Sequence, residues 1–257
     1  MADEVEDEQL DSHTLLNDED DQKLHLFIKA GRDGRTKGAC PFCQDIFLKL
    51  LIKREADNDF SFDVITINCK NPPKEFKEIS KKLPALIHGD TTYNDIDDIE
   101  DYLDSSFPNY KLATQDPEAF KIQSNVFTRF TYLIKDVHNN PRILLDELEK
   151  INSFLRTRNT KYISSNQITG LDCSLWPKLQ HIRVAGEYIL NFTIPTEFSA
   201  LWAYLGSAYE LDAFVKSCPS DQEIVLHWTR RETSSKEYLQ LTKDEPKFSF
   251  NLPNKLR

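Results

Sequence analysis

The chain has 257 residues, of which 39% are hydrophobic, and its formal net charge is −10. This length fits one large domain or two smaller ones with a packed core. The longest stretch without a charged residue, 198–209, is shorter than the roughly 20 apolar residues of a membrane-spanning helix, and the N-terminus lacks a signal-peptide pattern.

Residues 1–22 contain ten acidic residues and no lysine or arginine. Because the whole chain has 42 acidic and 32 basic residues, the body that follows is electrically balanced. We therefore expect 1–22 to be a separate, disordered acidic leader that serves either solubility or the binding of a partner. No basic block stands out from the body, so we expect no nucleic-acid partner.

The region 23–104 mixes strand and helix patterns. Strands are predicted over 23–31, 60–68, 83–90 and 91–95, where apolar and polar residues alternate or a short apolar run lies next to a turn. Apolar residues at helical spacing predict helices over 40–55, 72–82 and 96–107, the first of them amphipathic and packed on the sheet. This order of elements predicts a mixed sheet with helices on its faces.

From residue 105 onward the strand patterns disappear. After a linker over 105–112, helical patterns cover 118–137, 141–158, 171–189, 196–218 and 221–232. We predict an all-helical domain over 113–240 and a C-terminal appendage of weak periodicity over 241–257. Thr169, followed three positions later by Asp172, predicts a capped helix start, which leaves Cys173 as a small buried apolar residue.

The chain has five cysteines, at positions 40, 43, 69, 173 and 218. An odd number with a single close pair is unlike a secreted disulfide framework and indicates a compartment that keeps thiols reduced. We therefore expect a cytoplasmic chain. Cys69 and Cys218 are also candidates for oxidative dimerisation.

The close pair, Cys40 and Cys43, encloses a proline at the start of a predicted helix. Unpaired N–H groups and the positive end of the helix dipole favour a thiolate at this position. After a strand, the spacing is typical of a thioredoxin-like redox site, with Cys40 as nucleophile and Cys43 as resolving thiol. A zinc site would need two further ligands, which the sequence does not offer at suitable spacing. Two cysteines without a function are the other alternative.

Five segments together resemble the chloride intracellular channel (CLIC) family: 26–44, 83–103, 168–184, 192–214 and 217–224. The match covers about 23–228 and includes the specific patterns Asp-Cys-x-Leu-x-Pro-Lys-Leu and Ser-Cys-Pro-x-Asp-x-Glu-Ile. The resemblance implies the fold of omega-class glutathione transferases. In that fold a thioredoxin-like N-terminal domain precedes an all-helical C-terminal domain, in agreement with the division predicted above.

The same resemblance implies a glutaredoxin-like, glutathione-dependent thiol oxidoreductase centred on Cys40, with glutathione as co-substrate. The family positions that bind glutathione correspond to the backbone clamp at Leu83 and Pro84, the acid Asp95 for the glutamyl amine, and Lys29 and Phe42 lining the site. Ile96 stands where many members carry a hydroxyl residue, which predicts weaker glutathione binding. Cys43 stands where many members carry serine, which makes the site a dithiol.

The family also implies redox- or pH-dependent membrane insertion as an anion channel, through residues 41–64 of this chain. That stretch contains eight charged residues, and each charge near the bilayer centre costs about 2.5–3.5 kcal/mol. Insertion would thus require the N-terminal domain to unfold. The implied partners are membrane lipid and cytoskeletal or signalling proteins, for a folded monomer with reversible membrane association. The alternative is a non-catalytic scaffold or a membrane-recruited interaction protein on the same fold.

Overall fold

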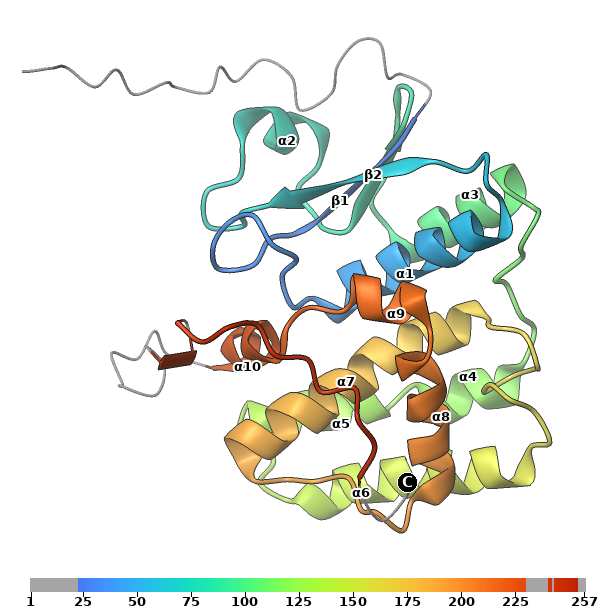
Figure 1. Ribbon diagram of the computed structural model, residues 1–257, viewed down its shortest axis with the longest axis vertical. Helices are drawn as coiled ribbons and strands as arrows, with labels where there is room; N and C mark the ends of the chain where they lie inside the picture. The colour runs from blue at the N-terminus through green and yellow to red at the C-terminus, as the bar shows by residue number, and fades with distance from the viewer. Residues whose placement is uncertain (1–22, 230–239, 242, 254–257) are drawn as a thin grey trace, which may run out of the picture.

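The structure, a computed structural model, describes residues 23–229, 240–241 and 243–253. The predicted acidic leader lies outside the described residues. Figure 1 shows a sheet with flanking helices that packs along one side on a larger group of helices. The predicted fold, a thioredoxin-like part followed by an all-helical part, is confirmed.

The first part is built on one mixed sheet with strand order β2-β1-β3-β4. Its strands are β1 (Leu24–Lys29), β2 (Phe62–Ile67), β3 (Ala85–His88) and β4 (Thr91–Tyr93). Its helices are α1 (Pro41–Ala56), α2 (Lys74–Ile79) and α3 (Ile96–Ser106). β1 pairs parallel with β2, whereas the pairs β1–β3 and β3–β4 are antiparallel. A parallel pair needs a crossover connection, and α1 supplies it.

Strand β1 is buried on both faces although its sequence alternates. Leu24, Leu26 and Ile28 join the main core on the face that α1 covers. Phe27 points to the other face and packs on Phe76 of α2, with ring centroids 5.5 Å apart. The reason is position: β1 is a central strand with helices over both faces, so its polar positions are also enclosed.

Between residues 113 and 229 the chain forms seven helices. They are α4 (Pro117–Gln123), α5 (Val126–Ile134), α6 (Pro141–Thr157), α7 (Gly170–Leu190), α8 (Ser199–Tyr209), α9 (Asp212–Ser217) and α10 (Asp221–Trp228). Two predicted helices are therefore each divided in two. The first breaks at Ser124 and Asn125, residue types that favour caps and turns over helix interiors. The second breaks at Leu211, whose backbone is extended (φ −90°, ψ 122°).

Helix α1 lies between the sheet on one side and α7 and α9 on the other (Figure 1). The predicted packing of this helix on the sheet is confirmed, and its polar side is buried as well. Lys49 is 1% exposed. Its ammonium lies 2.7 Å from the carboxylate of Asp45, one turn earlier, and also binds Glu100 of α3.

A second buried lysine of α1 holds the segment that joins the two parts. Lys53 is 2% exposed and donates to Asp104 of α3 (2.7 Å) and to the backbone oxygens of Phe107 (3.0 Å) and Tyr110 (2.7 Å). The Asp104 carboxylate also accepts the N–H of Leu112 (3.0 Å). One ammonium thereby fixes α1, α3 and the connection to the helical part.

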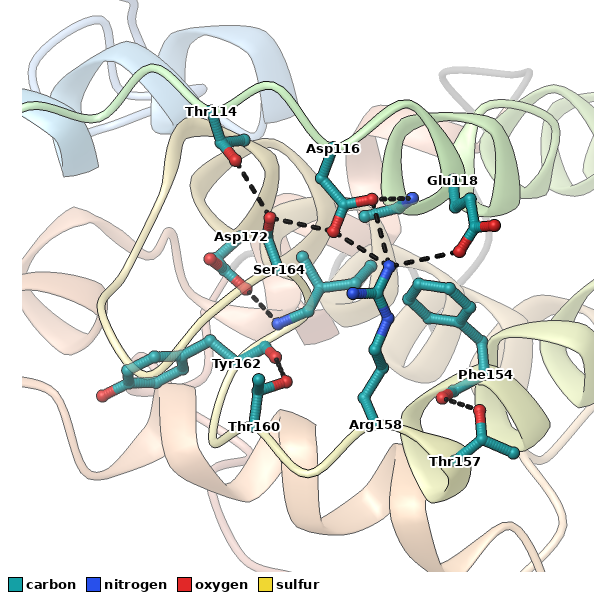
Figure 2. A network of polar contacts seen from close by, with 12 residues as sticks. Thr114, Asp116, Glu118, Phe154, Thr157, Arg158, Thr160, Tyr162, Ser164 and Asp172 are labelled. Atoms are coloured by element: carbon teal, nitrogen blue, oxygen red, sulfur yellow. Dashed lines mark hydrogen bonds and ion pairs between the residues drawn. The ribbon is translucent and has the colours of Figure 1, made fainter.

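The loop between α6 and α7 is held by the polar contacts that Figure 2 shows. The Arg158 guanidinium lies 3.0 Å from the carboxylate of Asp116, which also accepts the hydroxyl of Ser164 (3.1 Å). Asp172 accepts the N–H and the hydroxyl of Thr169, each at 2.8 Å. The predicted capped start of the helix after this loop is confirmed.

Within the predicted appendage, residues 243–253 run as an irregular strap along the helical part (Figure 1). The Arg183 guanidinium of α7 donates to the backbone oxygens of Ser249 and Asn251, both at 2.6 Å. Phe250 packs on Tyr209 of α8, with ring centroids 5.5 Å apart. A segment bound through its backbone needs no sequence periodicity, which explains the weak pattern.

Candidate active site

Cys40 is the N-cap residue of α1, with extended backbone (φ −122°, ψ 112°). Pro41 is the first helical residue, where a missing N–H costs nothing. The carbonyl of Cys40 accepts the N–H of Gln44 (2.9 Å), which closes the first turn. The thiol is half-buried and so remains within reach of a substrate.

Gly38 determines how closely this helix start approaches β1. Its N–H donates to the Lys29 carbonyl (2.8 Å), and a Cβ built on it would lie 2.3 Å from the Ala30 carbonyl oxygen. Only glycine allows this approach, because no side chain fits in that space. The loop therefore brings Cys40 beside the carboxyl end of β1.

The two thiols of the pair differ strongly in acidity. The hydrogen bond from the Cys43 thiol, the N–H groups of Cys43 and Phe42, and the Lys29 ammonium outweigh burial and lower the pKa of Cys40 to about 6. The bond to Cys40 and burial raise the pKa of Cys43 well above its usual value. At neutral pH the pair is thus a Cys40 thiolate next to a Cys43 thiol, the ionisation that a nucleophile and its resolving partner require.

Lys29 joins the pair from β1 through its backbone as well. Its N–H lies 3.5 Å from the Cys43 sulfur, toward which it points. Its ammonium acts on the Cys40 thiolate. Of the residues predicted to line the site, Lys29 is therefore in direct contact with the dithiol.

Phe42 is 42% exposed at the start of α1. Its ring packs edge-on against Phe127 of α5 (6.2 Å between centroids), and the Lys178 ammonium of α7 lies 6.0 Å from its centre. The helical part thus forms one wall beside the cysteine pair.

The predicted glutathione clamp lies at the start of β3. The Leu83–Pro84 peptide bond is cis, and Leu83 precedes the residues that pair with β1. Asp95 is exposed and caps α3 by accepting the N–H of Asp97 (3.2 Å). Within the described part of the chain, no hydrogen bond or ion pair joins Asp95 to Cys40 or Cys43.

Sequence reasoning missed a group of side chains contributed by the helical part. His227 of α10 places Nδ1 3.2 Å from the Lys29 ammonium. The indole N–H of the adjacent Trp228 donates to Nδ1 of the fully buried His181 (2.9 Å). No sequence signal pointed to these residues, because His227 is 198 positions from Lys29 and its helix shows only ordinary periodicity.

The remaining cysteines lie apart from this chemistry or at its margin. Cys173 is fully buried, as predicted for a small apolar residue, and Cys218 is fully buried too. Burial removes Cys218 from dimerisation in this fold, whereas Cys69 is exposed. Among the residues that the structure covers, no three or more histidine, cysteine or acidic side chains gather as metal ligands.

No helix in the described ranges combines the length and apolar character needed to cross a membrane.

Comparison with known proteins identifies the family. Residues 22–109 match the CLIC-like N-terminal domain, and 143–207 match the glutathione S-transferase C-terminal domain. The chain is 35% identical to the chloride intracellular channel Clic of Drosophila melanogaster, with 97% of each chain covered. The protein belongs to the chloride intracellular channel family. The resemblance inferred from the sequence motifs is confirmed.

A further relative in sequence and two solved structures match most of the chain. The chloride intracellular channel exl-1 of Caenorhabditis elegans is 33% identical, over 88% of this chain and 98% of its own. The chain also matches the crystal structure of the CLIC homologue EXC-4 from C. elegans, with 29% sequence identity and a TM-score of 0.80. This match covers 91% of this chain and 95% of the EXC-4 chain. The crystal structure of Chlamydomonas reinhardtii dehydroascorbate reductase shares the fold, with 24% sequence identity and a TM-score of 0.70. This match covers 80% of this chain and 97% of the reductase chain.

Proposed function

We propose that this CLIC family member, in its folded form, is a glutathione-dependent thiol–disulfide oxidoreductase of a reducing, cytoplasmic environment. The observation that carries the proposal is the ionisation of the cysteine pair. The half-buried Cys40 thiol has a pKa of about 6 because the Cys43 thiol, helix N–H groups and Lys29 stabilise its anion. Nothing in the packing of the helix requires a thiolate there, so catalysis accounts for it better than stability does.

The proposed reaction begins when the Cys40 thiolate attacks one sulfur of a substrate disulfide. A mixed disulfide forms on Cys40, and the other sulfur leaves as a thiolate that takes a proton from solvent. When the bound half is glutathione, a second glutathione thiolate attacks its sulfur. This step releases oxidised glutathione and regenerates the Cys40 thiolate, so one free glutathione is consumed for each glutathionylated substrate thiol that is released. Alternatively, Cys43 loses its proton and attacks the Cys40 sulfur, which expels the bound half as a thiolate that takes up a proton. The resulting Cys40–Cys43 disulfide is reduced by two glutathione molecules, which leave as oxidised glutathione.

Glutathione is the proposed co-substrate, held by the residues that the family resemblance indicates. The backbone of Leu83, next to the cis-Pro84, would pair with its cysteinyl residue, and the exposed Asp95 would receive its glutamyl amine. Lys29 and Phe42 would line the thiol end of the site. With Ile96 after the acid, only a backbone N–H remains for the glutamyl carboxylate, so we expect weak binding.

A membrane-inserted, anion-conducting form is a second proposal, supported by the family to which the chain belongs and by the names of its relatives. The energetics of α1 oppose it, since the segment contains the buried ion pairs of Lys49 and Lys53. Removing one partner of a buried pair costs about 3–5 kcal/mol. Insertion would therefore follow unfolding of the first part, with lipid as partner. A scaffold that binds cytoskeletal or signalling proteins would need neither the cysteine pair nor membrane insertion.

The deciding experiment is glutathione-dependent reduction of a mixed disulfide by the purified protein. We expect turnover by the wild type and only the background rate of glutathione for Cys40→Ser. Cys43→Ser separates the two routes, because it retains activity if glutathione resolves the intermediate and loses it if Cys43 does. An inactive wild type, with Cys40 no more reactive than a free thiol, would remove the enzyme proposal in favour of acid-triggered liposome conductance or partner binding.

A further inference from the structure

The last turn of α10 meets the end of β1 directly beside the cysteine pair. The Lys29 ammonium lies 3.2 Å from His227 Nδ1, although the two residues come from different parts of the fold. In Figure 1, α10 lies under the loop that joins β1 to α1. The same ammonium stabilises the Cys40 thiolate. One cation therefore links the thiol to the helical part.

The ionisation of His227 makes it the acceptor in this contact. Burial, together with the positive charges of Lys29 and Lys135, lowers the pKa of His227 to about 4. The imidazole is therefore neutral at physiological pH. Because the ammonium has only donors, Nδ1 offers its lone pair and the proton resides on Nε2.

Aromatic neighbours restrict the imidazole of His227. Its ring lies edge-on to Trp228 (5.0 Å between centroids) and to His181 (5.7 Å). Trp228 is in turn fixed by its hydrogen bond to His181 and by edge-on packing on Phe127 (5.8 Å). Such packing limits the rotamers of His227, so Nδ1 has a defined position.

We propose that His227 is a positioning residue for the redox thiol: its Nδ1 holds the Lys29 ammonium in place beside Cys40. A lysine side chain is flexible and strongly hydrated, so without an acceptor it samples the solvent. The other charged or titratable groups that face Lys29 are Glu223, Cys69 and His181. The Glu223 carboxylate attracts Lys29 only weakly, and it accepts the N–H of Arg32 (3.1 Å) in the neighbouring loop. His227 thus fixes the cation on the thiol side.

This role makes thiol reactivity depend on the docking of the helical part. The inference deepens the proposed function, since a positioned cation matters only if the thiolate reacts. It can nevertheless be tested without glutathione. A purely structural hydrogen bond between Lys29 and His227 would change stability but leave the acidity of Cys40 as it is.

The test is the pH dependence of Cys40 alkylation by iodoacetamide in the full-length protein, followed by peptide-resolved mass spectrometry so that Cys69 is scored separately. His227→Phe keeps a ring and removes the acceptor. Lys29 contributes least among the groups that lower the pKa of Cys40, so we expect the alkylation rate of this variant at pH 6 to fall about 2- to 3-fold, with an unchanged rate at pH 9. His227→Asn places an amide oxygen where Nδ1 was and should keep most of the wild-type rate.

Two further variants complete the design. Lys135→Met removes an exposed cation near His227 and should leave the Cys40 profile unchanged. Lys29→Met should slow alkylation at pH 6 like His227→Phe, and the double variant should be no slower than Lys29→Met, because His227 acts through Lys29. The proposal is overturned if His227→Phe leaves the profile unchanged, if His227→Asn is as slow as His227→Phe, or if the effects of Lys29→Met and His227→Phe add. Circular dichroism establishes that each variant is folded.

Discussion

The buried Lys53 provides a quantitative test of how the two parts are joined. Lys53→Met keeps most of the aliphatic chain and removes the ammonium. It leaves Asp104 without its cation and two backbone oxygens, those of Phe107 and Tyr110, without their donor. We expect a lower free energy of unfolding and a weaker attachment of the connecting segment.

The magnitude follows from these contacts. Breaking a buried ion pair costs about 3–5 kcal/mol, and a buried carbonyl that loses its hydrogen bond costs about 1–3 kcal/mol. These costs do not add, because Asp104 is 14% exposed and keeps the N–H groups of Leu112 and Ala113. We expect a loss of about 3 kcal/mol, which lowers the urea midpoint by about 1 M for an m-value near 3 kcal/mol/M.

The assay is equilibrium urea unfolding followed by tryptophan fluorescence and circular dichroism. Lys216→Met is the matched control, because Lys216 forms an exposed pair with Asp212 (3.1 Å) and should contribute about 0.3–0.5 kcal/mol. A loss below about 1 kcal/mol for Lys53→Met, or one equal to the control, would refute the reasoning that burial makes this pair important.

Three further predictions concern the site and its surroundings. Cys43→Ala removes the hydrogen bond that does most to lower the pKa of Cys40, so the rate of Cys40 alkylation at pH 6 should fall about 3- to 10-fold. Cys43→Ser keeps a hydrogen-bond donor and is the control. Equal alkylation rates for the two variants would show that this hydrogen bond does not lower the pKa of Cys40. Gly38→Ala forces a methyl group against the Ala30 carbonyl and should cost about 1–3 kcal/mol in urea unfolding; an unchanged midpoint would mean that the loop adjusts freely. Burial holds the pKa of His181 well below its usual value, so the unfolded state takes up this proton first. His181 therefore lowers stability as pH falls through about 6.5, with a slope that approaches about 1.4 kcal/mol per pH unit at lower pH. The stability difference between wild type and His181→Gln should therefore shift by about 1 kcal/mol from pH 6.5 to 5.5, because the unfolded-state histidine is already half protonated at pH 6.5. A constant difference would exclude the titration.

The features that the sequence predicted correctly are those set by near neighbours. The position of Cys40 at the start of α1 was predicted from the proline that follows it and from the spacing of three residues to Cys43. The cap formed by Asp172 on Thr169 was predicted from the same short spacing between those two residues. The order of strands and helices in the first part followed from hydrophobic periods. Each depends on interactions within about one helical turn, which the sequence displays directly.

The features that sequence could not supply depend on distant segments. The burial of Lys49 and Lys53 could not be predicted, because α7 and α3 cover them and acidic residues complete their ion pairs. The contact between His227 and Lys29 depends on the packing of α10 against the first part of the fold, which the sequence does not display. The divided helices were missed because apolar periodicity continues across a break when both pieces face one core.

The position of α1 between the two parts has a consequence for synthesis of the chain. α1 ends at Ala56, yet α7, which covers its outer side, is complete only at Leu190. At about 5–20 residues per second, the ribosome takes roughly 7–27 s to add the chain between them. Throughout that interval the emerging first part exposes the side of α1 that α7 and α9 later bury. A nascent chain stalled near the end of α3 would therefore be a substrate for chaperones, and the protein becomes one folding unit only when its helical part leaves the exit tunnel.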